Sequence, residues 1–350
     1  EKAIGAAEDG ELGAIDINTS GLTDFQSTVR TIGIDTDAGG AVELGGTVTI
    51  TGVDAAMFNE AVTVVATTTI EATGALVFGS TLDSAANQSN ALTINAGGAV
   101  TFTDAVGGTA AASELGALAI NTAGVTDFQS TVRAASLVTD ADGTVKLGGN
   151  VTATGADGVV LSDDATIDST ITITAAAGPV TFGKTLASAA GQGYGLTVTS
   201  GGAVTFTGAI GGASHETVAL GALVVKTAGL TDFQNAVRAL SILTDQPGSV
   251  GLNGNITVTG VDGAQFLENA VRINDNMSIV ATAADAPITF GGDIDSEDGE
   301  TNSLTLETLG SISVAGHVGS DDALAGITVT NADNVTFTGT VTADNFTQLD

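Results

Sequence analysis

The sequence lacks cysteine and tryptophan, and it has little tyrosine, methionine, proline or basic charge. Without cysteine the chain can form no disulfide, no thiol nucleophile and no thiolate metal site. Only 8 Lys and Arg residues stand against 40 Asp and Glu, which gives a net charge of −32. That balance argues against nucleic-acid binding, because phosphates require a basic surface. No run approaches about 18 uninterrupted apolar residues, so the sequence predicts no membrane-spanning helix.

Glycine and small apolar residues make up much of what is present. Glycine supplies 48 of the 350 residues, and 43% of the chain is apolar. Charged residues are 14%, below the roughly 25% of an ordinary soluble domain. Val, Ile, Leu and Phe are spread evenly along the chain, which argues against disorder. The chain therefore has enough apolar material for a folded core.

An internal repeat of about 104 residues organises the whole chain. Copies of the segment LGAIDINTSGLTDFQSTVR begin at Leu12, Leu115 and Leu220, and a fourth begins near Leu324. We therefore expect one continuous solenoid made of a short N-terminal tail, three repeats and the start of a fourth. The tail is 1–11, repeat 1 is 12–114, repeat 2 is 115–219 and repeat 3 is 220–323. Residues 324–350 are the start of repeat 4.

Each repeat is built from short segments in which apolar residues alternate with threonine. In the segments LTVT from Leu196 and VTFT from Val204, the apolar residues share one parity and threonine the other. Alternation with period two predicts half-buried strands, and Gly, Asn and Asp between them predict tight corners. About five coils of roughly 21 residues fit each repeat. The sequence thus predicts an all-β fold, a parallel β-solenoid in the form of a right-handed triangular β-helix. The TDFQSTVR stretch is expected to be strand or irregular structure.

The alternation also predicts which side chains face the core. Phe102, Phe206 and Phe290 are expected to be buried, with the neighbouring threonines exposed. Val145, Leu147 and Val151 are expected to point inward. In the corner Thr36-Asp37-Ala38-Gly39-Gly40 and its copies, Asp at the first turn position is expected to cap the turn's own amides.

Two segments carry a family resemblance. Residues 96–108 (AGGAVTFTDAVGG) and 196–212 (LTVTSGGAVTFTGAIGG) resemble the β-helical repeats of large secreted adhesins of Gram-negative bacteria, the filamentous-haemagglutinin-like exoproteins. The resemblance extends over the whole chain, and it implies a non-enzymatic rod, extracellular or on the cell surface, that serves attachment or surface structure. No secretion-recognition domain of that family is visible in the sequence.

The candidate sites are few. The acidic loop that follows Gly292 concentrates hard oxygen ligands that suit calcium, and Asp293, Asp295 and Asp298 are the expected ligands; no other cofactor and no catalytic residue is expected. Arg30, Arg133 and Arg238 recur at one place in three repeats, and each is expected to pair with an acid on a neighbouring coil. His215 and His317 are expected to be surface residues.

These expectations leave three functions open. The first is a structural or adhesive extracellular β-solenoid rod, and the second is the subunit of a filament whose solenoid continues from copy to copy. The third is a polysaccharide-active β-helix enzyme, which would need a cluster of Asp, Arg and aromatic residues on one face. Neither residues 1–11 nor residues 340–350 form a polar capping coil, so copies of the chain or adjoining repeats are the expected end-to-end partners.

Overall fold

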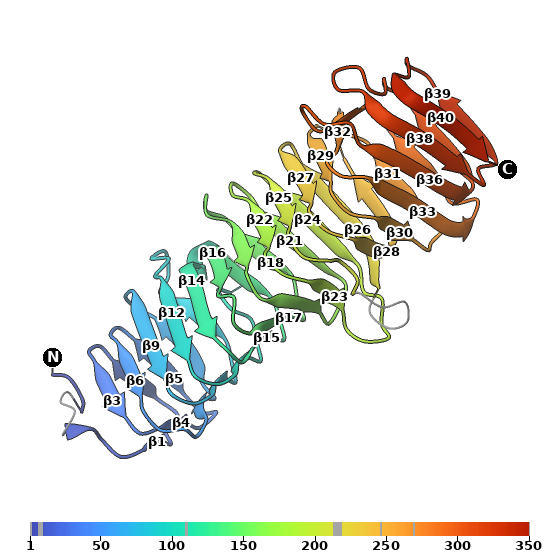
Figure 1. Cartoon of the computed structure of the whole chain (residues 1–350). Coiled ribbons are helices and arrows are strands. Elements are labelled where there is room, and N and C mark those ends of the chain that lie inside the picture. Colours follow the sequence, from blue (N-terminus) through green and yellow to red (C-terminus); the bar gives the residue numbers. More distant parts are fainter. Residues whose placement is uncertain are drawn as a thin grey trace. The chain divides into compact units, whose positions relative to one another are not determined.

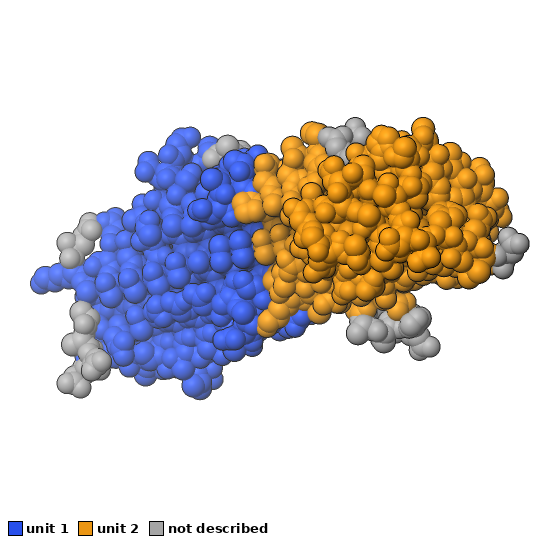
Figure 2. Space-filling view, turned by 45° about the horizontal axis from the view of Figure 1, so that its top comes forward, with its two compact units in different colours: residues 1–178 blue, residues 179–350 orange. Residues whose placement is uncertain are grey.

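The computed structural model describes residues 2–5, 10–108, 111–212, 219–245, 247–268 and 270–349. It is an all-β parallel β-solenoid of about 15 turns. Strands dominate these residues (Figure 1), and a 3₁₀ turn, Ala111–Ser113, is the one helical element named among them. The chain forms two compact units, Glu1–Gly178 and Pro179–Asp350 (Figure 2), which we describe one at a time.

Unit 1 contains strands β1 to β21, most of them three to five residues long. They are β1 (Ile15–Ile17), β2 (Leu22–Phe25), β3 (Val29–Thr31), β4 (Ile34–Thr36), β5 (Ala41–Leu44), β6 (Val48–Ile50), β7 (Ala56–Phe58), β8 (Ala61–Val64), β9 (Thr68–Ala72), β10 (Leu76–Phe78), β11 (Leu82–Ser84), β12 (Leu92–Ala96), β13 (Val100–Phe102), β14 (Leu115–Thr122), β15 (Val125–Phe128), β16 (Val132–Thr139), β17 (Thr144–Leu147), β18 (Val151–Ala153), β19 (Val159–Leu161), β20 (Asp164–Ile167) and β21 (Ile171–Ala175).

Unit 2 contains strands β22 to β40. They are β22 (Val180–Phe182), β23 (Leu186–Ser188), β24 (Leu196–Ser200), β25 (Val204–Phe206), β26 (Leu220–Thr227), β27 (Leu230–Phe233), β28 (Val237–Thr244), β29 (Ser249–Leu252), β30 (Ile256–Val258), β31 (Ala264–Phe266), β32 (Ala270–Ile273), β33 (Met277–Ala284), β34 (Ile288–Phe290), β35 (Asp293–Ser296), β36 (Ser303–Leu309), β37 (Ser311–Val314), β38 (Leu324–Thr330), β39 (Asn334–Phe337) and β40 (Ala343–Leu349).

The strands of unit 1 form three parallel stacks, because each strand pairs with the strand that occupies the same side of the next coil. One stack runs β1-β4-β7-β10-β13-β15-β17-β20. A second runs β2-β5-β8-β11 and continues through Val106 to the first half of β16, then β18 and β21. The third runs β3-β6-β9-β12-β14, then the second half of β16, then β19. One coil therefore uses one strand from each stack.

Equivalent segments of successive repeats lie in different stacks. In unit 1, β2 of repeat 1 and β15 of repeat 2 are copies of one segment, yet they belong to different stacks. From β2 the chain passes through β3 to β13, the bridge at Val106 and β14, so β15 is the fourteenth strand position onward. Because each coil has three strands, fourteen positions are four full coils and two further strands. The remainder of two moves the segment to another stack, and the total agrees with the expected five or so coils per repeat. In unit 2, β27 and β39 show the same displacement.

The core is filled by aliphatic residues and by ladders of stacked phenylalanine rings. In unit 1 the rings of Phe58, Phe78, Phe102 and Phe128 follow one another at centroid distances of 5.5, 5.1 and 4.8 Å. Parallel register places identical side chains directly over each other in successive coils, so their flat faces meet. Unit 2 contains the ladders Phe182–Phe206–Phe233 and Phe266–Phe290.

The predicted inward positions are confirmed. Phe102, Phe206 and Phe290 are at most 1% exposed, and Val145, Leu147 and Val151 are also buried. The threonines that follow two of the rings, Thr103 and Thr207, are exposed, whereas those within the strands are only half-buried. Their partial burial arises because coils directly above and below cover both sides of each strand residue. The TDF part of the TDFQSTVR stretch forms the last three residues of strands β2, β15 and β27, as expected for strand structure.

The Asp residue of the repeated corner stabilises a neighbouring coil. Oδ1 of Asp37 accepts the backbone N–H of Thr19 at 3.4 Å, and Oδ1 of Asp140 accepts that of Thr122 at 3.1 Å. Thr19 and Thr122 belong to the coil that precedes the corner, which is the coil stacked beneath it. The prediction that this Asp caps the amides of its own turn missed these contacts, because stacking brings the previous coil's amide within reach.

Candidate functional site

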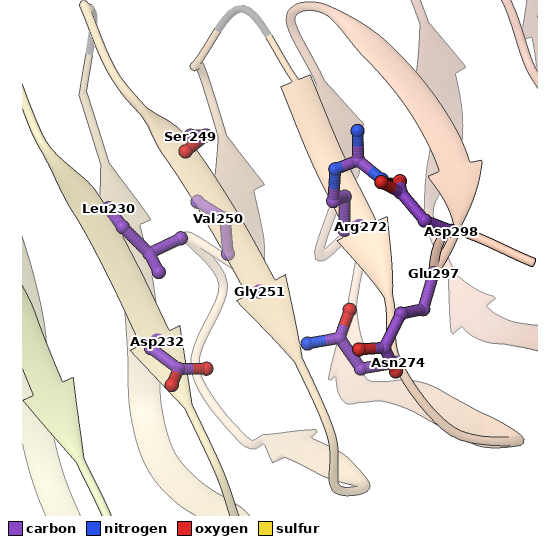
Figure 3. Close-up of a pocket in the computed structure, with 9 residues that line it drawn as sticks. All are labelled: Leu230, Asp232, Ser249, Val250, Gly251, Arg272, Asn274, Glu297 and Asp298. Carbon is purple, nitrogen blue, oxygen red and sulfur yellow. Dashed lines mark hydrogen bonds and ion pairs between the residues drawn. The ribbon is translucent and has the colours of Figure 1, made fainter. Parts of the chain in front are cut away.

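A shallow groove crosses the outer face of unit 2 where β27, β29, β32 and β35 lie side by side (Figure 3). Its volume is about 310 Å³. The parallel register aligns Asp232, Gly251, Arg272 and Asp295 in one row across these four strands. The groove is lined by Leu230, Asp232, Ser249, Val250, Gly251, Arg272, Asn274, Glu297 and Asp298.

The groove is open because the row has no side chain at Gly251. A Cβ atom added there would lie 3.0 Å from Oδ1 of Asp232 and 3.2 Å from Nδ2 of Asn274. The equivalent residues of the first two repeats are Glu43 and Lys146, whose side chains stand on the corresponding strands β5 and β17. Glycine therefore creates a notch between the polar groups of Asp232 and Arg272 that the other two repeats fill.

The walls of the groove carry three carboxylates and one guanidinium. Arg272 forms an ion pair with Asp298, and both side chains are largely exposed, at 43% and 79%. Such an exposed pair stabilises the fold by at most about 1 kcal/mol, so its geometry can change when a ligand arrives. Oδ1 of Asn274 is enclosed and accepts no hydrogen bond in the described structure. The groove therefore offers oxygen acceptors, one charged donor and a small uncovered floor.

Repeat 3 differs from the other repeats at several of these positions together. Glu297 and Asp298 stand where repeat 1 has Ala85-Ala86 and repeat 2 has Ala189-Ala190. Arg272 stands where the others have Thr63 and Thr166. The features that the repeats share do not reveal this groove, because they lie in the core and at the corners. The available signal was the opposite one: small residues in two repeats replaced by charged residues in the third.

The three expected calcium ligands do not converge on one point. Oδ1 of Asp293 accepts the backbone N–H of His317 at 2.6 Å, and Oδ1 of Asp295 accepts that of Asp321 at 3.0 Å. Asp298 is paired with Arg272 across the groove. Within the described residues, no group of three or more His, Asp or Glu side chains is arranged to hold a metal ion.

The expected loop after Gly292 is strand β35 over its first four residues. Calcium binding by this acidic segment stays a prediction, and melting curves test it. If an ion binds, added calcium should raise the melting temperature by mass action. The comparison of calcium with chelator needs moderate salt, because any cation screens the self-repulsion of a chain with a net charge of −32. Identical curves with calcium and with chelator would show that this segment binds no calcium.

The recurring arginines behave as expected in two repeats. Nε of Arg133 lies 3.0 Å from Oε2 of Glu114, which is buried, and Nε of Arg30 lies 3.9 Å from Oε1 of Glu11. The predicted ion pairs are therefore confirmed for these two arginines. The corresponding loop before β26 includes residues 213–218, which lie outside the described residues, and so does His215. His317 is exposed, as expected, and its Nδ1 accepts the backbone N–H of Thr340 at 3.0 Å.

No helix in the described part of the chain is long and apolar enough to cross a membrane. Searches of protein-family models, curated proteins and solved structures found no match to this chain.

Proposed function

We propose that this chain is a non-enzymatic, extracellular structural and adhesive β-solenoid of a bacterial cell surface or matrix, with calcium as its one candidate cofactor. The proposal rests on one observation: the repeats share their core residues but differ in the residues that line the groove. All three repeats share the residues that pack the core and join the coils, whereas Arg272, Glu297 and Asp298, which give the groove most of its charge, stand where repeats 1 and 2 have threonine or alanine. A shared core with one distinct groove is typical of a structural protein whose repeats form the support and whose groove contacts a ligand.

The partners proposed for the scaffold are further coils, either from adjoining repeats or from another copy of the chain. Val341 and Phe346 are 39% and 48% exposed, although each is aligned with a buried residue of the preceding coil, Val318 and Ile327. Another coil stacked on β40 would cover both side chains and pair its free backbone groups. A filament built from copies of the chain is the alternative that this stacking also supports.

The partner proposed for the groove is a hydroxyl-rich surface ligand such as a neutral saccharide. A sugar hydroxyl donates a hydrogen bond to a carboxylate or to Oδ1 of Asn274, and it accepts one from Arg272. Three carboxylates against one guanidinium disfavour an anionic ligand. The enzyme alternative calls for aromatic residues beside Asp and Arg on one face, and none is among the residues lining the groove. We therefore propose binding through hydrogen bonds to sugar hydroxyls and not hydrolysis.

Binding to immobilised neutral oligosaccharides of glucose, galactose, mannose and N-acetylglucosamine tests the groove. We expect the chain to bind at least one of these probes, and Gly251→Lys, which adopts the residue of repeat 2 at position 146, to weaken that binding at least about 10-fold. The double change Glu297→Ala and Asp298→Ala, which adopts the residues of repeats 1 and 2, should have a similar effect. A tenfold loss corresponds to about 1.4 kcal/mol, the scale of one or two lost hydrogen bonds.

The control changes the same position in another repeat. Lys146→Gly should leave binding unchanged, and circular dichroism should show that all variants stay folded. Absence of binding to every probe, or equal binding by the groove variants, would contradict a saccharide site. Release of reducing sugar from a bound probe would favour the enzyme alternative.

A further inference from the structure

An acidic residue recurs at one corner of each repeat and is buried there. Glu60, Asp163 and Glu268 occupy equivalent places, each the second residue after the end of β7, β19 or β31, and each is 1% exposed. Corners of a solenoid normally carry solvated polar groups, and a buried carboxylate without full hydrogen bonding is costly as an anion. The position is neither on the groove nor among the predicted calcium ligands.

Each of these acids lies over the repeated Asp-containing corner of the coil below. Oε1 of Glu60 would lie 2.6 Å from a Cβ added at Gly40, so this carboxyl occupies space that glycine leaves free. Asp163 accepts the backbone N–H of Gly143 at 2.8 Å. Glu268 accepts a hydrogen bond from the hydroxyl of Thr244. Gly40, Gly143 and Thr244 all belong to the copies of that corner.

The surroundings of Glu268 and Glu60 supply negative charge. The corner below Glu268 contributes Asp245, and the corner above it is Gly291-Gly292, which carries no ionisable group. The corner below Glu60 contributes Asp37, and the one above it is Gly79-Ser80. Both carboxyl oxygens of Glu60 are enclosed without a well-formed hydrogen bond. A proton on each buried carboxyl removes the repulsion and supplies the missing donor.

We propose that Glu60 and Glu268 are proton-binding clasps that hold successive coils together more tightly in acid than at neutral or alkaline pH. When protonated, each carboxyl is a neutral group that can donate a hydrogen bond to the corner below. When ionised, it is a buried anion beside a second carboxylate, and the contact between the two coils weakens. Glu268 is the stronger case, because the hydroxyl of Thr244 already joins its carboxyl to the corner below.

The titration behaviour agrees in direction. Burial is the largest cause that raises the pKa of Glu268, to about 7 from an ordinary 4.5, with a smaller contribution from Asp245, while the Thr244 hydroxyl opposes the rise. Burial also raises the pKa of Glu60, and the neighbouring Asp37 raises it further. A raised pKa means that the folded chain binds more protons than the unfolded chain between the two values. The contribution of protonated Glu268 to the free energy of unfolding is therefore fully present below about pH 4.5, and it is lost as pH rises through about 7.

Urea unfolding between pH 5.5 and 8.5 tests the clasps, in a background with His215→Asn and His317→Asn so that no histidine titrates. We expect the unfolding equilibrium constant to rise by about 30-fold between pH 5.5 and pH 8.5, for a carboxyl whose pKa is 4.5 in the unfolded chain and about 7 in the folded chain. Glu268→Gln, which mimics the protonated carboxyl, should remove most of that rise, and adding Glu60→Gln should reduce it further.

Glu71→Gln, at an exposed position, is the matched control and should leave the pH dependence unchanged. Equal pH dependence in the background protein and the double clasp variant would overturn the proposal. So would a stability at pH 8.5 that falls with chelator and recovers with calcium, because the buried carboxylates would then hold a cation in place of a proton. If a variant does not fold, the pH dependence of the background protein at constant ionic strength still decides, since a flat profile contradicts the clasps.

Discussion

Replacing Phe102 by alanine is expected to lower the free energy of unfolding by about 3–5 kcal/mol. Phe102 is 1% exposed and lies between two other rings, at centroid distances of 5.1 Å to Phe78 and 4.8 Å to Phe128. The thin core has no mobile side chain large enough to fill the space, because the coils above and below are fixed by backbone hydrogen bonds. Loss of both stacking contacts adds to the cavity cost. Urea unfolding at constant pH measures the change.

Phe102→Leu is the matched control, because it keeps most of the buried volume and removes only the ring contacts. Leu161 of repeat 2 stands where repeats 1 and 3 have Phe58 and Phe266, so the fold accepts leucine in a ladder position. We expect this variant to lose less than about 2 kcal/mol. Equal destabilisation by leucine and alanine would show that ring stacking, and not volume, dominates.

The second large effect is expected for Gly107→Ala, at more than about 3 kcal/mol. Gly107 has a φ of +77°, and a Cβ there would lie 1.7 Å from the carbonyl oxygen of Arg133. Its N–H donates to the carbonyl of Leu82 at 2.7 Å, so the backbone cannot move away without losing a bond between coils. Gly5, Gly211 and Gly319, the equivalent residues of the other copies, also have positive φ.

Gly191→Ala separates the two causes, because Gly191 has a φ of +75° but no atom within 4 Å of an added Cβ. We expect it to cost only the backbone strain, about 1–2 kcal/mol. Thermal unfolding of both variants under the same conditions makes the comparison. Similar losses at the two positions would mean that the close approach between coils at Gly107 relaxes easily.

Parity and repetition were sufficient to predict the scaffold. Alternation placed Phe206 and Leu147 correctly in the core, because side chains in a strand can face only two ways. The repeat length predicted roughly five coils, because a coil of short strands and corners takes about 20 residues. Both inferences depend on local geometry that the sequence carries directly.

The corners and the outer faces were harder to predict, because their environment depends on which coil lies above and below. Glu268 looks like a solvated corner residue in sequence, and only stacking over the corner of Thr244 and Gly248 buries it. Asp232 and Glu297 are 65 residues apart, and they line one groove because three successive pairings place β27, β29, β32 and β35 in one sheet. The expected calcium ligands failed to converge for a related reason: stacking gave each of Asp293, Asp295 and Asp298 a separate partner from another coil.

The displacement of β2 and β15 into different stacks has a consequence for how such a protein can change its length. Each repeat adds fourteen strand positions, and fourteen is not a multiple of three. Unequal recombination that adds one repeat therefore moves every segment of the later repeats to a neighbouring stack, on another side of the coil. Loss of one repeat turns them the other way, and only a change of three repeats restores the original facing. Since the core accepts the same segment in any of the three stacks, these events preserve the fold. They change the side of the solenoid on which the outward-facing side chains of the later repeats lie. The number of repeats then determines the direction in which the later repeats face, and evolution could change that direction without any amino-acid substitution.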